Sequence, residues 1–153
     1  MSKIVFEKET LPLSVYKNTL QDCINYVLRK IQETDKGITW VICSEEYLYK
    51  RSNKSAILKT PIKLEMVRSN KYGIAVPKKR TIYISTAAIQ SKFAINSTLK
   101  KLFKLLGQPQ IDLLERVIID EFTHIVTCKN HGDEEYERTY AKYINMLMKV
   151  DYF

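Results

Sequence analysis

The sequence predicts an α+β protein in which an N-terminal helix and a small, mainly antiparallel or mixed sheet precede a helical C-terminal part. Three observations support this class. Apolar residues recur at helical spacing early in the chain, short β-branched and aromatic runs occupy the middle, and helical spacing returns after residue 85. With 153 residues, 45% of them hydrophobic, the chain is long enough for one core, so we expect a single domain over 1–153.

The N-terminal part is predicted to contain one short strand and one long helix. Residues 4–6 are expected to form an edge strand. A row of apolar residues predicts a helix from about residue 13 to 34, and Gly37 is expected to end it. The row consists of Leu20, Ile24, Val27, Leu28 and Ile31.

The middle of the chain is predicted to form the sheet. Residues 38–43 are β-branched and aromatic, as in a buried strand, and residues 57–68 alternate between apolar and polar side chains, as in a half-exposed strand. Residues 74–76 and 81–85 flank Pro77-Lys78-Lys79-Arg80, which predicts a hairpin with a basic turn. We expect strand 81–85 to lie at a sheet edge, where an extended peptide could pair with it.

Three helices are predicted after the sheet. The first spans residues 97–106 and is expected to end at Gly107. The second begins at Pro109, and its core positions are Leu114, Val117, Ile118, Phe122 and Ile125. The third runs from about residue 133 to 150, and its core positions are Tyr136, Tyr140, Tyr143, Ile144 and Leu147.

The residues best suited to chemistry lie in the second of these helices. It contains Asp120-Glu121-Phe122-Thr123-His124 and is followed by His131, so it holds or adjoins both histidines of the protein. Residues four apart differ by about 40° around a helix, so Asp120 and His124 share a face. On a continuing helix His131 would lie about 16 Å from Asp120 along the axis. The helix is therefore expected to end near residue 128 or 129 and the chain to turn back, because Asn130 and Gly132 tolerate a left-handed backbone.

The two acids of this stretch follow the apolar run Val117-Ile118-Ile119, which places them near the core. Burying their charges without a partner would be costly, and a bound metal ion would compensate. The alternatives are a solvated helix face for Asp120 and Glu121, and a hydrogen-bonded core position for His124. The three cysteines, Cys23, Cys43 and Cys128, form no CxxC pair and are expected to be reduced core thiols.

The element order and this motif resemble the minimal zincin metalloproteases, most closely the SprT-like family, with the WLM and YgjP-type proteins nearby. Those families carry His-Glu-x-x-His and a third His after a short gap, whereas here Asp120 replaces the first His and Gly132 follows His131. The resemblance implies a zincin-like fold with zinc bound by Asp120, His124 and His131. It also implies that Glu121 is catalytic and activates a metal-bound water. Tyr136 or Tyr140 would then steady an oxyanion, unless both are core aromatics.

Positive charge is concentrated in the middle of the chain. Residues 50–104 contain 14 Lys and Arg and one acid, although the whole protein has a net charge of +8. Such a block usually contacts phosphate, and the alternative is a lysine-rich solvated surface. The candidate residues for binding DNA or another nucleic acid are Lys78, Lys79, Arg80, Lys100, Lys101 and Lys104.

Two functions follow as hypotheses. The first is a zinc-dependent, SprT-like metalloprotease that hydrolyses peptide bonds, with proteins near nucleic acid as substrates. The second is a catalytically degenerate protein on the same scaffold, acting as a nucleic-acid-binding or interaction module. The sequence has no run of 18 apolar residues and no apolar N-terminal signal, so we expect an intracellular protein without a membrane span.

Overall fold

The computed structural model describes residues 2–44, 46–48, 72–93 and 113–149. The strands are β1 (Lys3–Phe6), β2 (Thr39–Cys43), β3 (Gly73–Val76) and β4 (Thr81–Ser85). The α-helices are α1 (Lys17–Lys30), α4 (Thr86–Phe93), α6 (Leu113–Thr127) and α7 (Glu134–Met148). Two 3₁₀ segments, η1 (Lys8–Tyr16) and η3 (Pro77–Lys79), complete the labelled elements. The class predicted from the sequence, mixed α and β, is confirmed.

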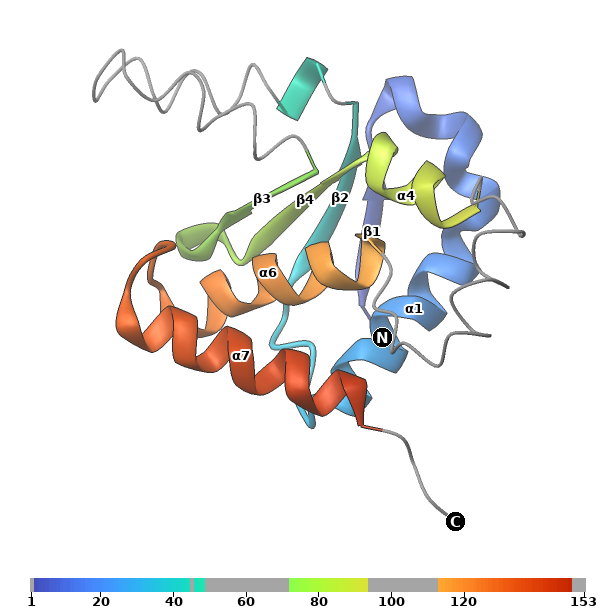
Figure 1. Ribbon diagram of the computed structural model, residues 1–153. Coiled ribbons are helices and arrows are strands. Elements are labelled where there is room, and N and C mark those ends of the chain that lie inside the picture. Colours follow the sequence, from blue (N-terminus) through green and yellow to red (C-terminus); the bar gives the residue numbers. More distant parts are fainter. Residues whose placement is uncertain (1, 45, 49–71, 94–112, 150–153) are drawn as a thin grey trace.

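The four strands form one mixed sheet in the order β1-β2-β4-β3 (Figure 1). Strand β1 pairs in parallel with β2, β2 pairs in parallel with β4, and β3 pairs antiparallel with β4. A mainly antiparallel or mixed sheet was predicted, and the described strands form a mixed one. The reason is that η1 and α1 form the crossover that parallel β1 and β2 require, whereas the short turn of η3 makes β3 and β4 a hairpin.

The position of β4 also corrects a prediction. Residues 81–85 were expected to form an edge strand, but β4 is paired on both sides, with Thr81 opposite Thr39 on one strand and Val76 on the other. Among the described strands the edges are β1, as predicted, and β3. A peptide therefore cannot add to β4.

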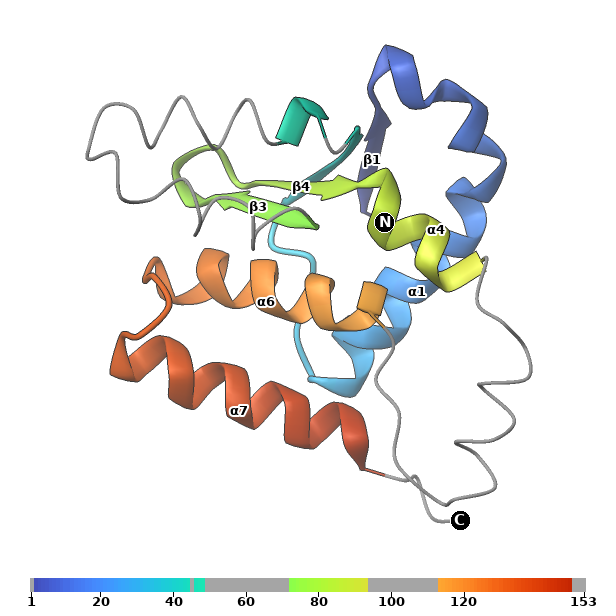
Figure 2. The same ribbon diagram turned by 45° about the horizontal axis from the view of Figure 1, so that its top comes forward.

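Helices α1 and α6 cover one face of the sheet, and α7 lies on the outer side of α6 (Figure 2). Alternation along the strands supports this layering, because Trp40, Ile42, Ile82 and Ile84 belong to the same buried cluster as the apolar residues of α1 and α6. The intervening residues Val41, Cys43 and Tyr83 face the other way and pack with Leu48. All five core residues predicted for α6 are buried; in α7, Tyr136, Tyr143 and Leu147 are buried, and Tyr140 and Ile144 are partly buried.

The first long helix is shorter than predicted at both ends. Residues 8–16, which include Pro12, form a 3₁₀ segment, so α1 begins at Lys17. The helix ends because Gln32 adopts a left-handed backbone with φ 58°, while the Gln32 and Glu33 amides donate to the Arg29 and Leu28 carbonyls. Glycine usually occupies the left-handed position that ends a helix in this way, so the glutamine at position 32 does not indicate a helix end in the sequence. The predicted strand 57–68 and helix 97–106 lie outside the described residues.

Helices α6 and α7 confirm the predicted change of direction. Helix α6 ends at Thr127, and α7 begins at Glu134, capped by Asp133, whose carboxylate accepts hydrogen bonds from the Glu135 and Tyr136 amides. Within the described ranges, no helix has the length and apolar character needed to cross a membrane.

The Asp133 cap predicts a measurable stability difference. Replacing Asp133 with Ala leaves two amides of the first turn of α7 without their acceptor, so the free energy of unfolding should fall by about 1 kcal/mol. Urea titration of the metal-free protein measures it. Asp133→Asn is the matched control because asparagine caps helices about as well as aspartate; equal losses in both variants would contradict the capping explanation.

Candidate metal centre

Three electron-pair donors converge at the end of α6. The Nε2 atoms of His124 and His131 are 3.2 Å apart. Asp120 Oδ1 lies 3.5 Å from the His124 Nε2 and 3.4 Å from the His131 Nε2. Within the part of the chain that the structure describes, this is the one group of His, Cys, Asp or Glu side chains arranged to hold a metal ion. All three were predicted as ligands, and the structure brings them together.

A backbone contact fixes the chemical state of the His124 ring. Its Nδ1 lies 2.7 Å from the Lys129 carbonyl oxygen, which can only accept a hydrogen bond, so Nδ1 carries the proton. The Nε2 atom therefore presents its lone pair to Asp120 and His131. A second hydrogen bond that orients a histidine in this way is typical of metal ligands. Burial lowers the pKa of the His124 ring, against the opposing effects of the Lys129 carbonyl and Asp120, and this favours the neutral ring that a metal requires.

The turn between α6 and α7 brings His131 back to the helix. Cys128, directly after α6, has φ 55°, and Gly132 has φ 88°. Asn130 was expected to adopt this left-handed conformation together with Gly132, but Cys128 does so instead. The Gly132 amide donates to Glu137 Oε1 at 3.0 Å, which ties the turn to α7. Cys128 is exposed, so the prediction that it is a core thiol is wrong, whereas Cys23 and Cys43 are buried as predicted.

Tyr136 on α7 contacts all three donor residues, Asp120, His124 and His131. Its hydroxyl donates a hydrogen bond to Asp120 Oδ1. Its ring stacks on His124 with centroids 4.5 Å apart and meets the His131 ring edge-on at 4.7 Å. Burial and the bond to Asp120 raise the pKa of Tyr136, so the hydroxyl keeps its proton. The sequence placed Tyr136 either at an oxyanion or in the core; it is buried, and its hydroxyl points to Asp120.

Glu121, the predicted catalytic residue, lies beside the cluster and is 5% exposed. Burial raises the pKa of its carboxyl well above the usual range, and the neighbouring charge of Asp120 raises it further. A divalent cation at the three donors would oppose both effects. Strand β3 approaches this carboxylate so closely that a Cβ on Gly73 would lie 3.0 Å from Glu121 Cγ and 2.9 Å from Val117 Cγ1.

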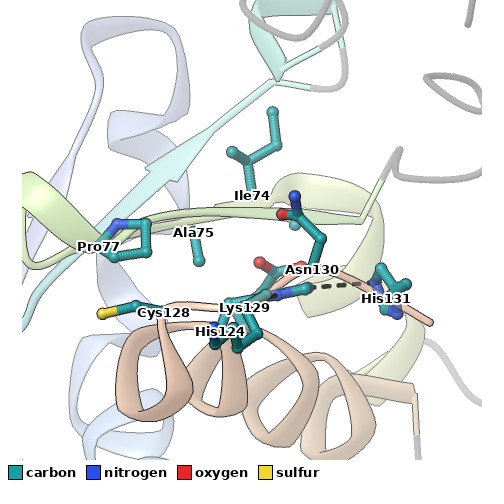
Figure 3. A pocket seen from close by; sticks show the side chains of 10 residues that line it. Ile74, Ala75, Pro77, His124, Cys128, Lys129, Asn130 and His131 are labelled. Atoms are coloured by element: carbon teal, nitrogen blue, oxygen red, sulfur yellow. Dashed lines mark hydrogen bonds between the residues drawn. The ribbon is translucent and has the colours of Figure 1, made fainter. Parts of the chain in front are cut away.

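A cavity of about 200 Å³ opens between β3 and the end of α6. It is lined by Gly73, Ala75 and Pro77 on the strand side and by Glu121, His124 and His131 on the other. Figure 3 labels Ala75 and Pro77 on the strand side and His124 and His131 opposite them. In Figure 3 Ala75 points from β3 toward α6, whereas Ile74 points away from it. A second cavity of about 310 Å³ shares Gly73, Glu121 and His131 with the first and continues between α6 and α7. The donors therefore lie along a groove with room for a ligand on both sides.

The spacing of the three donor atoms can be compared with the geometry around a single bound metal ion. Three ligands that hold zinc at about 2.0–2.1 Å in a tetrahedron lie about 3.3 Å from one another. The observed separations, 3.2, 3.4 and 3.5 Å, are close to this value. The three atoms therefore lie close enough together to share one metal ion.

The predicted nucleic-acid residues divide into two sets. Lys78, Lys79 and Arg80 are exposed at the turn between β3 and β4, and Arg80, with φ 46°, donates to the Lys36 carbonyl at 3.2 Å. Lys100, Lys101 and Lys104 lie outside the described residues.

Comparison of the chain with protein-family models and with curated proteins finds no match. The resemblance to zincins therefore rests on the sequence motif and the element order.

The close approach of Gly73 to Val117 and Glu121 predicts that Gly73→Ala lowers stability by an amount that depends on Val117. In Gly73→Ala the new methyl group displaces Val117 and Glu121, and such overpacking should lower the free energy of unfolding by about 1–3 kcal/mol. Thermal unfolding of the metal-free protein measures it. In the Val117→Ala background the same change should cost clearly less, because one of its two neighbours has been shortened. An equal cost in both backgrounds would show that the Gly73–Val117 contact is not the cause.

Proposed function

We propose that this protein is a zinc-dependent peptidase. The observation that carries the proposal is the triangle formed by Asp120 Oδ1 and the Nε2 atoms of His124 and His131, with sides of 3.2 to 3.5 Å. Three protein ligands leave the fourth tetrahedral position for water or substrate, as in catalytic zinc sites. The buried Glu121 lines the same cavity as His124 and His131.

Each residue has a distinct role in this proposal. When bound, zinc supplies Lewis acidity, which polarises a substrate carbonyl and acidifies water. Glu121 accepts the proton of the attacking water and returns it to the leaving amine. Its enclosure between α6 and Gly73 excludes bulk water and holds the carboxylate on the groove. Lys129, through its carbonyl, keeps the His124 ring oriented toward the other two donors.

The edge strand β3 supports an extended peptide as the substrate. The Ser85 amide donates to the Tyr72 carbonyl, which makes Tyr72 and Ser85 a hydrogen-bonded pair of the hairpin. Pairing alternates along antiparallel strands, so the backbone groups of Gly73 and Ala75 point away from β4. Both residues line the groove beside the donors. A peptide that pairs with them as an added strand would pass directly over Glu121.

The basic turn suggests where an acidic partner would lie. Pro77 lines the cavity, and the exposed Lys78, Lys79 and Arg80 follow it at that end of the groove. This supports substrates with acidic or phosphate-bearing flanks, including proteins on nucleic acid. The non-catalytic, nucleic-acid-binding alternative depends on the same turn.

Zinc binding is the first test. The purified protein reconstituted with zinc should hold about one ion per chain. Asp120→Ala and His124→Ala should lose it, because each removes one of three ligands. Cys128→Ser is the control, since Cys128 lines the same cavity without belonging to the donor group, and it should keep its zinc. Elemental analysis after dialysis gives the ratio. A wild-type protein that stays metal-free and binds DNA with steep salt dependence would favour the alternative.

Glu121→Gln separates binding from catalysis. The amide has nearly the same shape but cannot accept the proton, so zinc content should stay unchanged while peptide cleavage falls at least about a hundredfold. Cleavage of unstructured proteins or quenched peptides is followed beside the wild type. A Glu121→Gln protein that cleaves at the wild-type rate would rule out the proposed mechanism.

A further inference from the structure

We infer that Tyr136 is the positioning residue that lets an aspartate serve as a metal ligand at the first position of the motif. The inference rests on the metal centre of the proposed function, and it does not require peptidase activity. Tyr136 acts through the ligands, and it is not assigned a contact with substrate.

The Tyr136 hydroxyl donates to the same Asp120 oxygen that faces the two histidines. Asp120 Oδ1 is the carboxylate oxygen nearest to both histidine Nε2 atoms, and it is also the oxygen that accepts the Tyr136 hydrogen bond. A carboxylate oxygen offers two lone pairs, so one can accept from the hydroxyl while the other points toward the cluster. An aspartate side chain is shorter than a histidine and can bind a metal through either or both oxygens. The hydroxyl selects one oxygen and restrains its orientation.

The aromatic ring makes a separate contribution. It lies nearly parallel to the His124 ring, with an angle of 23° between the planes, and it is tilted by 68° from the His131 ring. The Tyr136 side chain thus restrains both imidazoles as well as the carboxylate. Removing a side chain that hydrogen-bonds a metal ligand, as the Tyr136 hydroxyl does, typically weakens metal affinity by about 10–100-fold.

Tyr140 offers a matched control on the same helix. It stacks on Tyr136 with ring centroids 5.9 Å apart and is partly buried. Within the described residues, the aromatic ring that meets both histidine rings and the hydroxyl that donates to Asp120 belong to Tyr136. Removing the Tyr140 hydroxyl therefore changes a neighbouring tyrosine without touching the carboxylate–hydroxyl bond.

The experiment measures zinc affinity of the full chain by competition with a chromophoric chelator at fixed pH. Tyr136→Phe, which keeps the ring, should weaken zinc binding about 10–100-fold. Tyr136→Leu, which also removes the ring, should weaken it further, and Tyr140→Phe should match the wild type. The thermal unfolding midpoint of each metal-free variant shows whether the fold is retained. The cobalt-substituted proteins provide a spectroscopic readout, because Tyr136→Phe should shift the visible bands and Tyr140→Phe should not.

The sharpest test compares the effect of Tyr136→Phe on zinc affinity in two backgrounds, in which the inference expects different directions. In an Asp120→His background the ligand no longer needs a hydroxyl donor, and the phenol oxygen crowds the larger ring. Tyr136→Phe should then leave zinc affinity unchanged or raise it, although it lowers affinity when Asp120 is present. The same loss in both backgrounds would overturn the inference and assign Tyr136 a merely structural role.

The remaining outcomes are distinguishable. Unchanged zinc affinity in Tyr136→Phe overturns the inference and leaves the peptidase proposal intact. A wild-type protein that binds no zinc overturns both. A zinc-binding wild type that cleaves no peptide, with the predicted loss in Tyr136→Phe, supports the inference and removes only the proposed activity.

Discussion

The constraint on which the candidate site depends is the meeting of three electron-rich atoms, Asp120 Oδ1 and two imidazole nitrogens, within 3.5 Å of one another. Lone pairs at such distances repel unless a proton or a cation lies among them. The surrounding structure nevertheless holds them there. The Lys129 carbonyl orients one ring, the left-handed Cys128 and Gly132 return the other, and Tyr136 touches all three. So many independent restraints on one small volume favour a site shaped for an ion over a chance cluster.

Much of the site could be predicted because its information is local. The spacing of Asp120 and His124 determines their shared helix face, and the distance to His131 requires the helix to end before it. The side chains that complete the site could not be predicted in the same way. Nothing in the sequence around Gly73 indicates that the strand passes against Glu121, and the hydroxyl of Tyr136 finds its acceptor only after α7 packs on α6. Both contacts depend on tertiary structure.

The fold was predicted to a similar extent. Helical and strand periodicity identified the four described strands and the helices α1, α6 and α7, but it did not predict α4, and two further kinds of error arose. The end of α1 was misplaced because Gln32 adopts a backbone angle that favours glycine, and the left-handed residue of the turn after α6 is Cys128 and not Asn130; at both positions tertiary packing outweighs that preference. The edge assignment of residues 81–85 failed because strand order is set by the crossover through α1, which no local pattern encodes.

The compactness of the donor set along the chain has a thermodynamic consequence. Asp120, His124 and His131 lie so close in sequence that a denatured chain needs to close only short loops to bring them together. If the protein binds zinc as proposed, its denatured ensemble retains some affinity for the ion, and zinc then stabilises the fold only by the difference between the affinities of the folded and denatured states. Zinc would raise the melting temperature by less than its dissociation constant from the folded protein implies, and refolding in the presence of zinc would begin from chains already chelated at this segment.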